Sequence, residues 1–158
     1  GDIRDMFYNT LQEADMLVQI CTYTLGQKTD EVNEFFEIIK DLLKSERQVR
    51  LIVHDDNEDG KKKRPSCSNE AKREISKLER KYPSKFFPQY FRPTSKGILH
   101  AKFVVVDRKI ALVGSANISK YALSLNHEIM LKVSGEIAAN LSSMFDQLSE
   151  TLRGEYVG

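Results

Sequence analysis

The stretch from His100 to Asn117 constrains the fold of this chain more than any other part of its sequence. Its first apolar run, Phe103–Val106, is largely β-branched, so a buried strand is predicted from His100 to Asp107, with the histidine at its entry. Its second apolar run, Ile110–Val113, follows after three residues and ends at a glycine. Both runs are too short to be helices of ordinary length, which favours strands.

The polar residues around these two runs are of the kinds that hold a phosphate. On a strand, residues two apart point to the same face and lie about 6.6 Å apart, so His100 and Lys102 would present an imidazole and an ammonium group side by side. Gly114–Asn117 is predicted to be a turn that leads into a short helix over residues 118–125. Backbone N–H groups at such a helix start, with the Ser115 hydroxyl and the Asn117 amide, form an anion site.

Together these residues form a complete pattern, H-x-K-x4-D-x6-G-S-x-N, that begins at His100. The pattern resembles the HKD motif of the phospholipase D superfamily, and every fixed position is filled. The resemblance extends to Glu128, which follows Ser115 at the interval where nucleases of that superfamily carry a glutamate that hydrogen-bonds the catalytic histidine. It implies an α/β fold in which a mixed, largely parallel β-sheet is flanked by helices on both faces.

The resemblance also implies a role for each motif residue in the cleavage of a phosphodiester. His100 would attack phosphorus to form a phosphohistidine that water then cleaves, and Glu128 would hold the other ring nitrogen. The phosphoryl oxygens would be held, in place of a metal ion, by Lys102, Ser115 and Asn117. No metal and no cofactor are expected. Asp107, on the strand face opposite His100, and Gly114 are expected to be structural.

The single motif predicts a dimer. One histidine cannot be the nucleophile and also the acid that protonates the leaving oxygen. In the superfamily two motifs surround one site, and a single-motif chain achieves this by two-fold dimerisation. A homodimer that shares one composite site is therefore expected. The alternative is a second motif in a part of the parent protein outside these 158 residues.

The rest of the chain alternates helical and strand patterns, which favours a single catalytic α/β domain over residues 1–158. Helices are expected where apolar residues recur at helical spacing, and strands where short apolar runs occur. The expected helices are Asp2–Glu13, a helix capped by Thr29 or Asp30 that extends to Leu43, Ala71–Tyr82 and a last helix that starts at Gly135. The expected strands outside the motif are Met16–Leu25, Val49–His54 and Glu128–Val133.

A polar loop is expected over residues 55–68, where four acidic residues precede four basic ones and Gly60 and Pro65 act as breakers. The loop is either a solvated, partly disordered excursion or a segment whose basic half contacts a polyanion backbone. Interleaved aromatic and basic residues follow at Lys85–Lys96, which suit either a strand with a core face or single-stranded nucleic acid held by stacking. The candidate substrate-binding residues are Lys61, Lys62, Lys63, Arg64, Arg92 and Lys96.

Composition says less about partners than the motif does, because 24 basic and 23 acidic residues give a net charge of +1. Any nucleic-acid surface must therefore be a local patch. Nucleic acid, DNA rather than RNA, is the expected substrate, since small single-motif relatives without a membrane anchor are commonly nucleases and the flanks of the motif are basic. A lipid phosphodiesterase and a non-catalytic nucleic-acid-binding or scaffold module on the same fold are the alternatives.

Other kinds of site find little support in the sequence. Cys21 and Cys67 have neither disulfide nor metal-ligand spacing, and no converging ligand set for zinc is present. Ser115 lacks the G-x-S-x-G elbow of serine hydrolases. His54 ends an expected strand beside Asp55 and is expected to be a loop residue, and His127 is expected to flank the site without acting in it. The free thiols, with no membrane span or signal peptide in view, predict an intracellular, cytoplasmic protein, with targeting segments outside the chain left open.

Overall fold

The computed structural model describes residues 3–26, 30–93, 100–115 and 129–157. In chain order the elements are α1 (Ile3–Gln12), β1 (Leu17–Thr22), α2 (Asp30–Lys44), β2 (Gln48–His54), α3 (Asn69–Lys81), β3 (Phe86–Phe91), β4 (Phe103–Val106), β5 (Ile110–Gly114), β6 (Met130–Ser134) and α4 (Glu136–Val157). The expected order of helices and strands is thus confirmed in these ranges. The short helix expected over residues 118–125 lies outside them.

Within the described residues, six strands form one mixed sheet in the order β3–β2–β1–β4–β5–β6. β1 pairs in parallel with β2, and β2 with β3. The pairings of β1 with β4, β4 with β5 and β5 with β6 are antiparallel. The sheet is thus mixed, as expected, but its described strands are not largely parallel, because the motif strands pair antiparallel, β4 with β1 and β5 with β4. β1 therefore belongs both to the parallel part of the sheet, with β2 and β3, and to the antiparallel part, with β4, β5 and β6. It is buried from Val18 to Thr22, as a strand covered on both faces must be.

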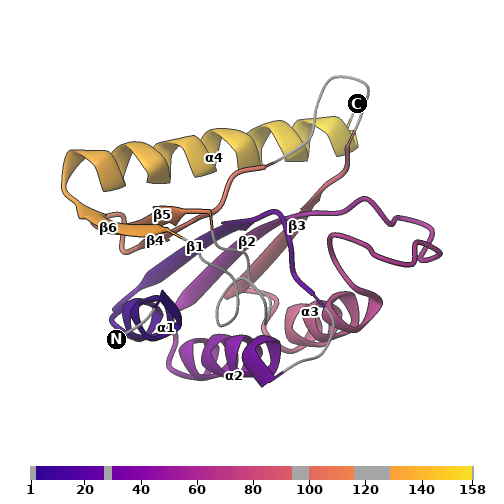
Figure 1. Cartoon of the computed structure of the whole chain (residues 1–158), viewed down its shortest axis with the longest axis horizontal. Coiled ribbons are helices and arrows are strands. Elements are labelled where there is room, and N and C mark those ends of the chain that lie inside the picture. The colour runs from indigo at the N-terminus through magenta and orange to yellow at the C-terminus, as the bar shows by residue number, and fades with distance from the viewer. Residues whose placement is uncertain (1–2, 27–29, 94–99, 116–128, 158) are drawn as a thin grey trace.

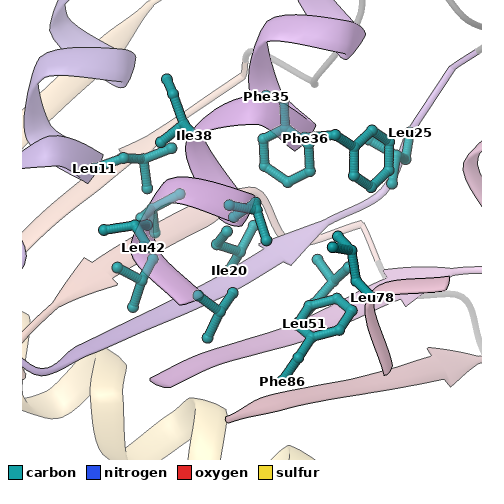
Figure 2. Packing of buried hydrophobic residues seen from close by; sticks show 14 of the residues in the cluster. Leu11, Ile20, Leu25, Phe35, Phe36, Ile38, Leu42, Leu51, Leu78 and Phe86 are labelled. Carbon is teal, nitrogen blue, oxygen red and sulfur yellow. The ribbon is translucent and has the colours of Figure 1, made fainter. Parts of the chain in front are cut away.

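Helices cover both faces of the sheet, which confirms the expected layered α/β arrangement. α1, α2 and α3 lie on one face, and the long α4 crosses the other (Figure 1). No helix of the described residues, α4 included, is long and apolar enough to span a bilayer. Successive side chains of β1 point to opposite faces, so Ile20 belongs to the larger core and Cys21 to the core beneath α4. Figure 2 shows part of the larger core, including Leu11, Ile20, Phe35, Phe36, Leu42, Leu51, Leu78 and Phe86.

The motif strand, expected to begin at His100, is shorter in the structure, where β4 begins at Phe103. The reason lies in the neighbouring strand. β1 ends at Thr22, whose hydroxyl donates to the carbonyl two residues on as the chain turns away, so the ladder with β4 stops there. Residues 100–102 therefore form an irregular segment that stays beside β5, where the N–H of Gly114 donates to the Lys102 carbonyl at 3.3 Å.

Asp107 joins the end of β4 to the start of β1. Its carboxylate accepts the backbone N–H groups of Asp15, Met16 and Leu17 at 2.8, 2.8 and 2.9 Å, and its own N–H donates to the Leu17 carbonyl at 2.8 Å. Burial acts to raise the pKa of Asp107, but the three N–H donors outweigh it, so the pKa lies below its ordinary value. The charged carboxylate thus fastens the chain that enters β1.

We expect Asp107→Ala to destabilise the fold by about 2 kcal/mol at neutral pH, because three backbone N–H groups lose a charged acceptor. Since the folded-state pKa is lowered, the contribution of the carboxylate is complete above the unfolded value of about 3.9 and is lost as the pH falls through the folded value. Urea denaturation should show a difference from the wild type at neutral pH that shrinks below about pH 4. Asp41→Ala, at an exposed position of α2, is the control, and a difference for Asp107→Ala that is independent of pH would contradict this account.

Candidate active site

His100, Lys102 and Ser115 of the motif lie at one end of the strands, the site edge of the sheet, whereas Asp107 lies at the opposite end. Parallel pairing places the carboxyl ends of β1, β2 and β3 at this edge, and antiparallel pairing adds the start of β4, the end of β5 and the start of β6. In open α/β sheets ligands bind outside the carboxyl ends of the strands. The topology therefore provides a binding site at the edge where His100 and Lys102 precede β4.

His100 and Lys102 lie side by side at this edge, as expected, although they do not lie on a strand. Lys102 Nζ is 3.1 Å from His100 Nδ1 and 3.4 Å from the His100 carbonyl oxygen. An ammonium group can only donate, so Nδ1 is the acceptor in this contact. The His100 side chain is exposed and that of Lys102 is partly exposed, so both can reach a phosphate that arrives from solvent.

Ser115 follows β5, where the chain is bound to the residue before β6. Its N–H donates to the Ile129 carbonyl at 3.0 Å, and its hydroxyl oxygen accepts the Ile129 N–H at 3.2 Å. Gly114 is required beside this pair, because a Cβ atom on it would lie 2.0 Å from the Ile129 carbonyl oxygen. Backbone packing thus explains the glycine of the motif.

Three of the predicted catalytic residues, His100, Lys102 and Ser115, are placed at one edge of the sheet by this arrangement. The other two, Asn117 and Glu128, lie outside the described residues, as does the predicted substrate contact Lys96. Their roles stay predictions.

Tyr23 and His54 also lie at this edge, although the sequence analysis assigns neither to the site. His54 ends β2, as expected for the strand Val49–His54, but it is not a loop residue, because only 2% of it is exposed. The centroid of the Tyr23 ring lies 4.6 Å from that of His54 and 4.7 Å from that of His100. The signal that could have identified them is their position at the ends of strands, because the carboxyl ends of parallel strands meet at one edge.

The polar loop over residues 55–68 starts from the same edge and is fixed at its ends. Its buried residues are Asp55, Asn57, Ser66, Cys67 and Ser68. The reading of the loop as a solvated excursion is therefore wrong for these ends. The Asp55 carboxylate pairs with Lys72 Nζ of α3 at 2.8 Å and with Arg92 Nε at 3.6 Å, and Arg92 also pairs with Glu58 at 3.7 Å. Arg92, a predicted substrate contact, is thus engaged in holding the loop.

The basic half of the loop remains at the surface. Lys61, Lys63 and Arg64 are exposed, whereas Lys62 pairs with Asp56. The hydrogen bond to Asp56 raises the pKa of Lys62. Burial acts to raise the pKa of Asp56, but its hydrogen bonds with Lys62 and the Ser66 N–H outweigh burial and lower it. This pair therefore keeps its charges over a wide pH range, next to three exposed cations.

The chain is similar in sequence to a described family. Residues 7–149 match the family model described as cardiolipin synthase, PLD-like domain. This match includes the whole HKD-like pattern and most of the described fold. No curated protein sequence matches the chain.

Solved structures share the fold. NucT from Helicobacter pylori superposes with a TM-score of 0.70 at 23% identity, covering 92% of this chain and 86% of that one. Nuc, a phospholipase D family member from Salmonella typhimurium, gives a TM-score of 0.67 at 13% identity, covering 91% and 84%. Phosphatidylserine synthase from Haemophilus influenzae gives 0.69 at 16% identity, covering 94% of this chain but 35% of the synthase. At these identities the likeness concerns the fold.

Proposed function

The chain belongs to the phospholipase D-like family, and from this membership we propose that it is a metal-independent phosphodiesterase that cleaves nucleic acid, in particular DNA, through a phosphohistidine intermediate. One observation carries the proposal. At the carboxyl edge of the sheet, an exposed imidazole and an ammonium group are in contact, with 3.1 Å between His100 Nδ1 and Lys102 Nζ. This pair offers a nucleophile and a positive charge to one phosphate.

The chemistry of phosphodiester hydrolysis assigns the roles. The reaction requires a nucleophile in line with the leaving oxygen, neutralisation of the equatorial oxygens and an acid. A neutral imidazole nitrogen of His100 forms a bond to phosphorus as the bond to the leaving oxygen breaks, and a second histidine gives that oxygen a proton. Water then attacks the phosphohistidine and restores the imidazole, while the second histidine takes the proton back.

Lys102 has two acceptors within its reach during this cycle. Without substrate, its ammonium group donates to His100 Nδ1. A bound phosphodiester brings a charged oxygen, which is a stronger acceptor, so Lys102 turns to it. Nδ1 is then open to the carboxylate that we assign to Glu128, and this contact fixes the tautomer whose other nitrogen attacks phosphorus.

Nucleic acid is favoured as the substrate by the charges near the site. Lys61, Lys63 and Arg64 are exposed on a loop that begins where β2 reaches the site edge. Cations beside a phosphodiester site suit a polyanion, because they can neutralise the neighbouring phosphates.

A lipid phosphodiester is the second candidate, because the family description names cardiolipin synthase and one structural neighbour is a phosphatidylserine synthase. The chemistry at phosphorus would be the same, and only the leaving group and the surrounding surface would differ. Anionic phospholipid vesicles are therefore the competing substrate in the assay below. Cleavage of vesicle lipid without cleavage of DNA would favour this candidate.

A homodimer completes the proposed site, because it supplies the second histidine. Next to the site, Ile129 and Leu131 are 72% and 62% exposed. Ile129 is hydrogen-bonded to Ser115, and β6 is the outermost strand on that side of the described sheet. Exposed apolar side chains beside a site are typical of protein interfaces, so we expect a second copy of the chain to bury Ile129 and Leu131.

The proposed activity is tested with plasmid DNA in excess EDTA. We expect cleavage to persist, because His100 and Lys102 supply what a metal ion supplies in other nucleases, and we expect His100→Ala to abolish it without changing the circular dichroism spectrum. Activity lost in EDTA and restored by magnesium would contradict the mechanism, and cleavage by His100→Ala would contradict the site. A wild-type protein that cleaves neither DNA nor vesicle lipid would indicate a non-catalytic module.

The composite site is tested by subunit mixing. Heterodimers of wild-type and His100→Ala subunits should have very low activity, because each site needs both histidines, whereas half the wild-type rate would mean that each subunit acts alone. Leu131→Lys should produce monomers in sedimentation and reduce activity with them. Met16→Lys, at an apolar position that is 75% exposed beside the opposite end of β1, is the matched control and should stay dimeric.

The nucleic-acid surface is tested by the salt dependence of DNA binding. The log-log slope should be about −0.9 for each duplex phosphate neutralised, or about −0.7 on single strands. A triple alanine variant of Lys61, Lys63 and Arg64 should have a shallower slope and weaker binding on all sequences equally, since phosphate contacts do not read bases. The matched control is a triple alanine variant of the exposed α3 residues Lys77, Arg80 and Lys81. Equal slopes in the two variants would remove the loop from the binding surface.

A further inference from the structure

Four aromatic rings lie in a row across the site edge, one from each of four neighbouring strands. Phe91 ends β3, His54 ends β2, Tyr23 follows β1 and His100 precedes β4. Successive ring centroids are 6.2, 4.6 and 4.7 Å apart, and the ring planes are inclined by 21°, 34° and 43°. The row therefore runs from β3, an outer strand of the described sheet, to the exposed histidine of the motif.

The inner part of this row is held in one orientation. The Ser66 hydroxyl donates to the His54 carbonyl at 2.8 Å and is 2.9 Å from His54 Nδ1. Because the only hydroxyl hydrogen of Ser66 is used by the carbonyl, Nδ1 must be the donor and Nε2 carries the lone pair. Nε2 is buried and has no hydrogen-bond partner in the part of the chain that the structure describes. The hydrogen bond with Ser66 thus fixes both the ring plane and the tautomer of His54.

His54 cannot itself touch a substrate, because only 2% of it is exposed. It cannot therefore be the acid that protonates the leaving oxygen. Burial lowers the pKa of His54, against the raising effect of Asp56 and Asp55, while Lys62 and His100 lower it further. The His54 side chain that packs against Tyr23 is thus a neutral imidazole. Any influence of His54 on the reaction must pass through the tyrosine ring.

Tyr23 contacts both residues of the proposed reacting pair. Its ring lies against His100, and the Lys102 ammonium is 5.9 Å from its centroid, within the range of a cation–π contact. His100 is exposed and lies outside the described strands, so the hydrogen bonds of the described sheet do not hold it in place. The Tyr23 ring is the surface against which this side chain rests.

We propose that Tyr23 is a positioning residue of the reaction, which fixes the ring plane of His100 for attack on phosphorus, and that buried His54 supports Tyr23 from behind. This inference rests on the proposed phosphodiesterase function. An exposed imidazole without such support would sample several rotamers, of which one places nitrogen in line with the leaving oxygen. Restriction to that rotamer raises the rate of the chemical step without adding any contact to the substrate.

The decisive comparison is between Tyr23→Leu, which removes the ring, and Tyr23→Phe, which keeps it. With bis-para-nitrophenyl phosphate as the substrate, Tyr23→Leu should lower kcat by about 10- to 100-fold, which is the order of loss expected from misplacing a reacting group, with little change in KM. Tyr23→Phe should retain kcat within about 2-fold, because stacking needs no hydroxyl group. Wild-type kcat in Tyr23→Leu, or a loss in Tyr23→Phe equal to that in Tyr23→Leu, would overturn the inference.

The supporting role of His54 is tested in the same way. His54→Phe keeps a ring behind Tyr23 and should retain most of kcat, whereas His54→Leu removes the ring and should lower kcat in the direction of Tyr23→Leu. A loss in His54→Phe as large as that in His54→Leu would overturn the stacking role. Tyr82→Leu, a partly buried tyrosine that packs on the larger core at the end of α3, is the control for lost stability.

A measurement independent of catalysis separates this inference from the proposed function. The chain has three histidines, so the His100 ring protons can be identified in NMR spectra by comparison with His100→Ala. A nuclear Overhauser effect between the Tyr23 and His100 rings is expected in the wild type, and its absence would overturn the inference without any measurement of activity. If the effect is present but the wild type cleaves no phosphodiester, the proposed function fails and the positioning role fails with it, although the ring contact stands.

Discussion

The structure depends on the fact that β1 is hydrogen-bonded to neighbours that run in opposite directions. β2 is parallel to it and β4 is antiparallel. Because β4 runs backwards, its first residues arrive at the edge where β1, β2 and β3 end. His100, which is far along the chain from Tyr23 and His54, is thereby brought next to them. A parallel β4 would have placed the motif histidine at the opposite edge, away from both rings and from the basic loop.

Much of the fold can be predicted from the sequence, because its elements are marked by local patterns. Apolar residues at helical spacing and short apolar runs correctly placed the helices and strands in the described ranges. Errors arose where a partner element decides the outcome. The strand expected from His100 begins at Phe103 because the chain turns away from β4 after Thr22, the last residue of β1. The residues of the motif alone cannot indicate where this other strand ends. The buried ends of the polar loop were missed for the same reason, since Asp55 is paired with Lys72 of a later helix.

Some contacts of the site can likewise be predicted from a local sequence pattern, and others cannot. The contact of His100 with Lys102 follows from a spacing of two residues in any extended segment, so the sequence is enough to predict it. The row of rings depends on the order of four strands, which long-range pairing determines. The sequence correctly places His54 at the end of a strand but predicts a loop residue, whereas the structure shows a buried ring held by Ser66. Asn117 and Glu128 belong to the site by resemblance alone, because they lie outside the described residues.

The contact of Gly114 with Ile129 separates two kinds of requirement within one motif. The proposed reaction needs His100 and Lys102, and we expect a chain without them still to fold. Gly114 is needed because any side chain would collide with a carbonyl oxygen of the adjoining strand segment, so the fold itself depends on it. In a descendant that kept this fold but lost the proposed activity, substitutions of the histidine and the lysine would be tolerated, whereas the glycine would be retained. A relative in which only the glycine of the motif remains would thus have kept the fold after losing the proposed catalytic residues.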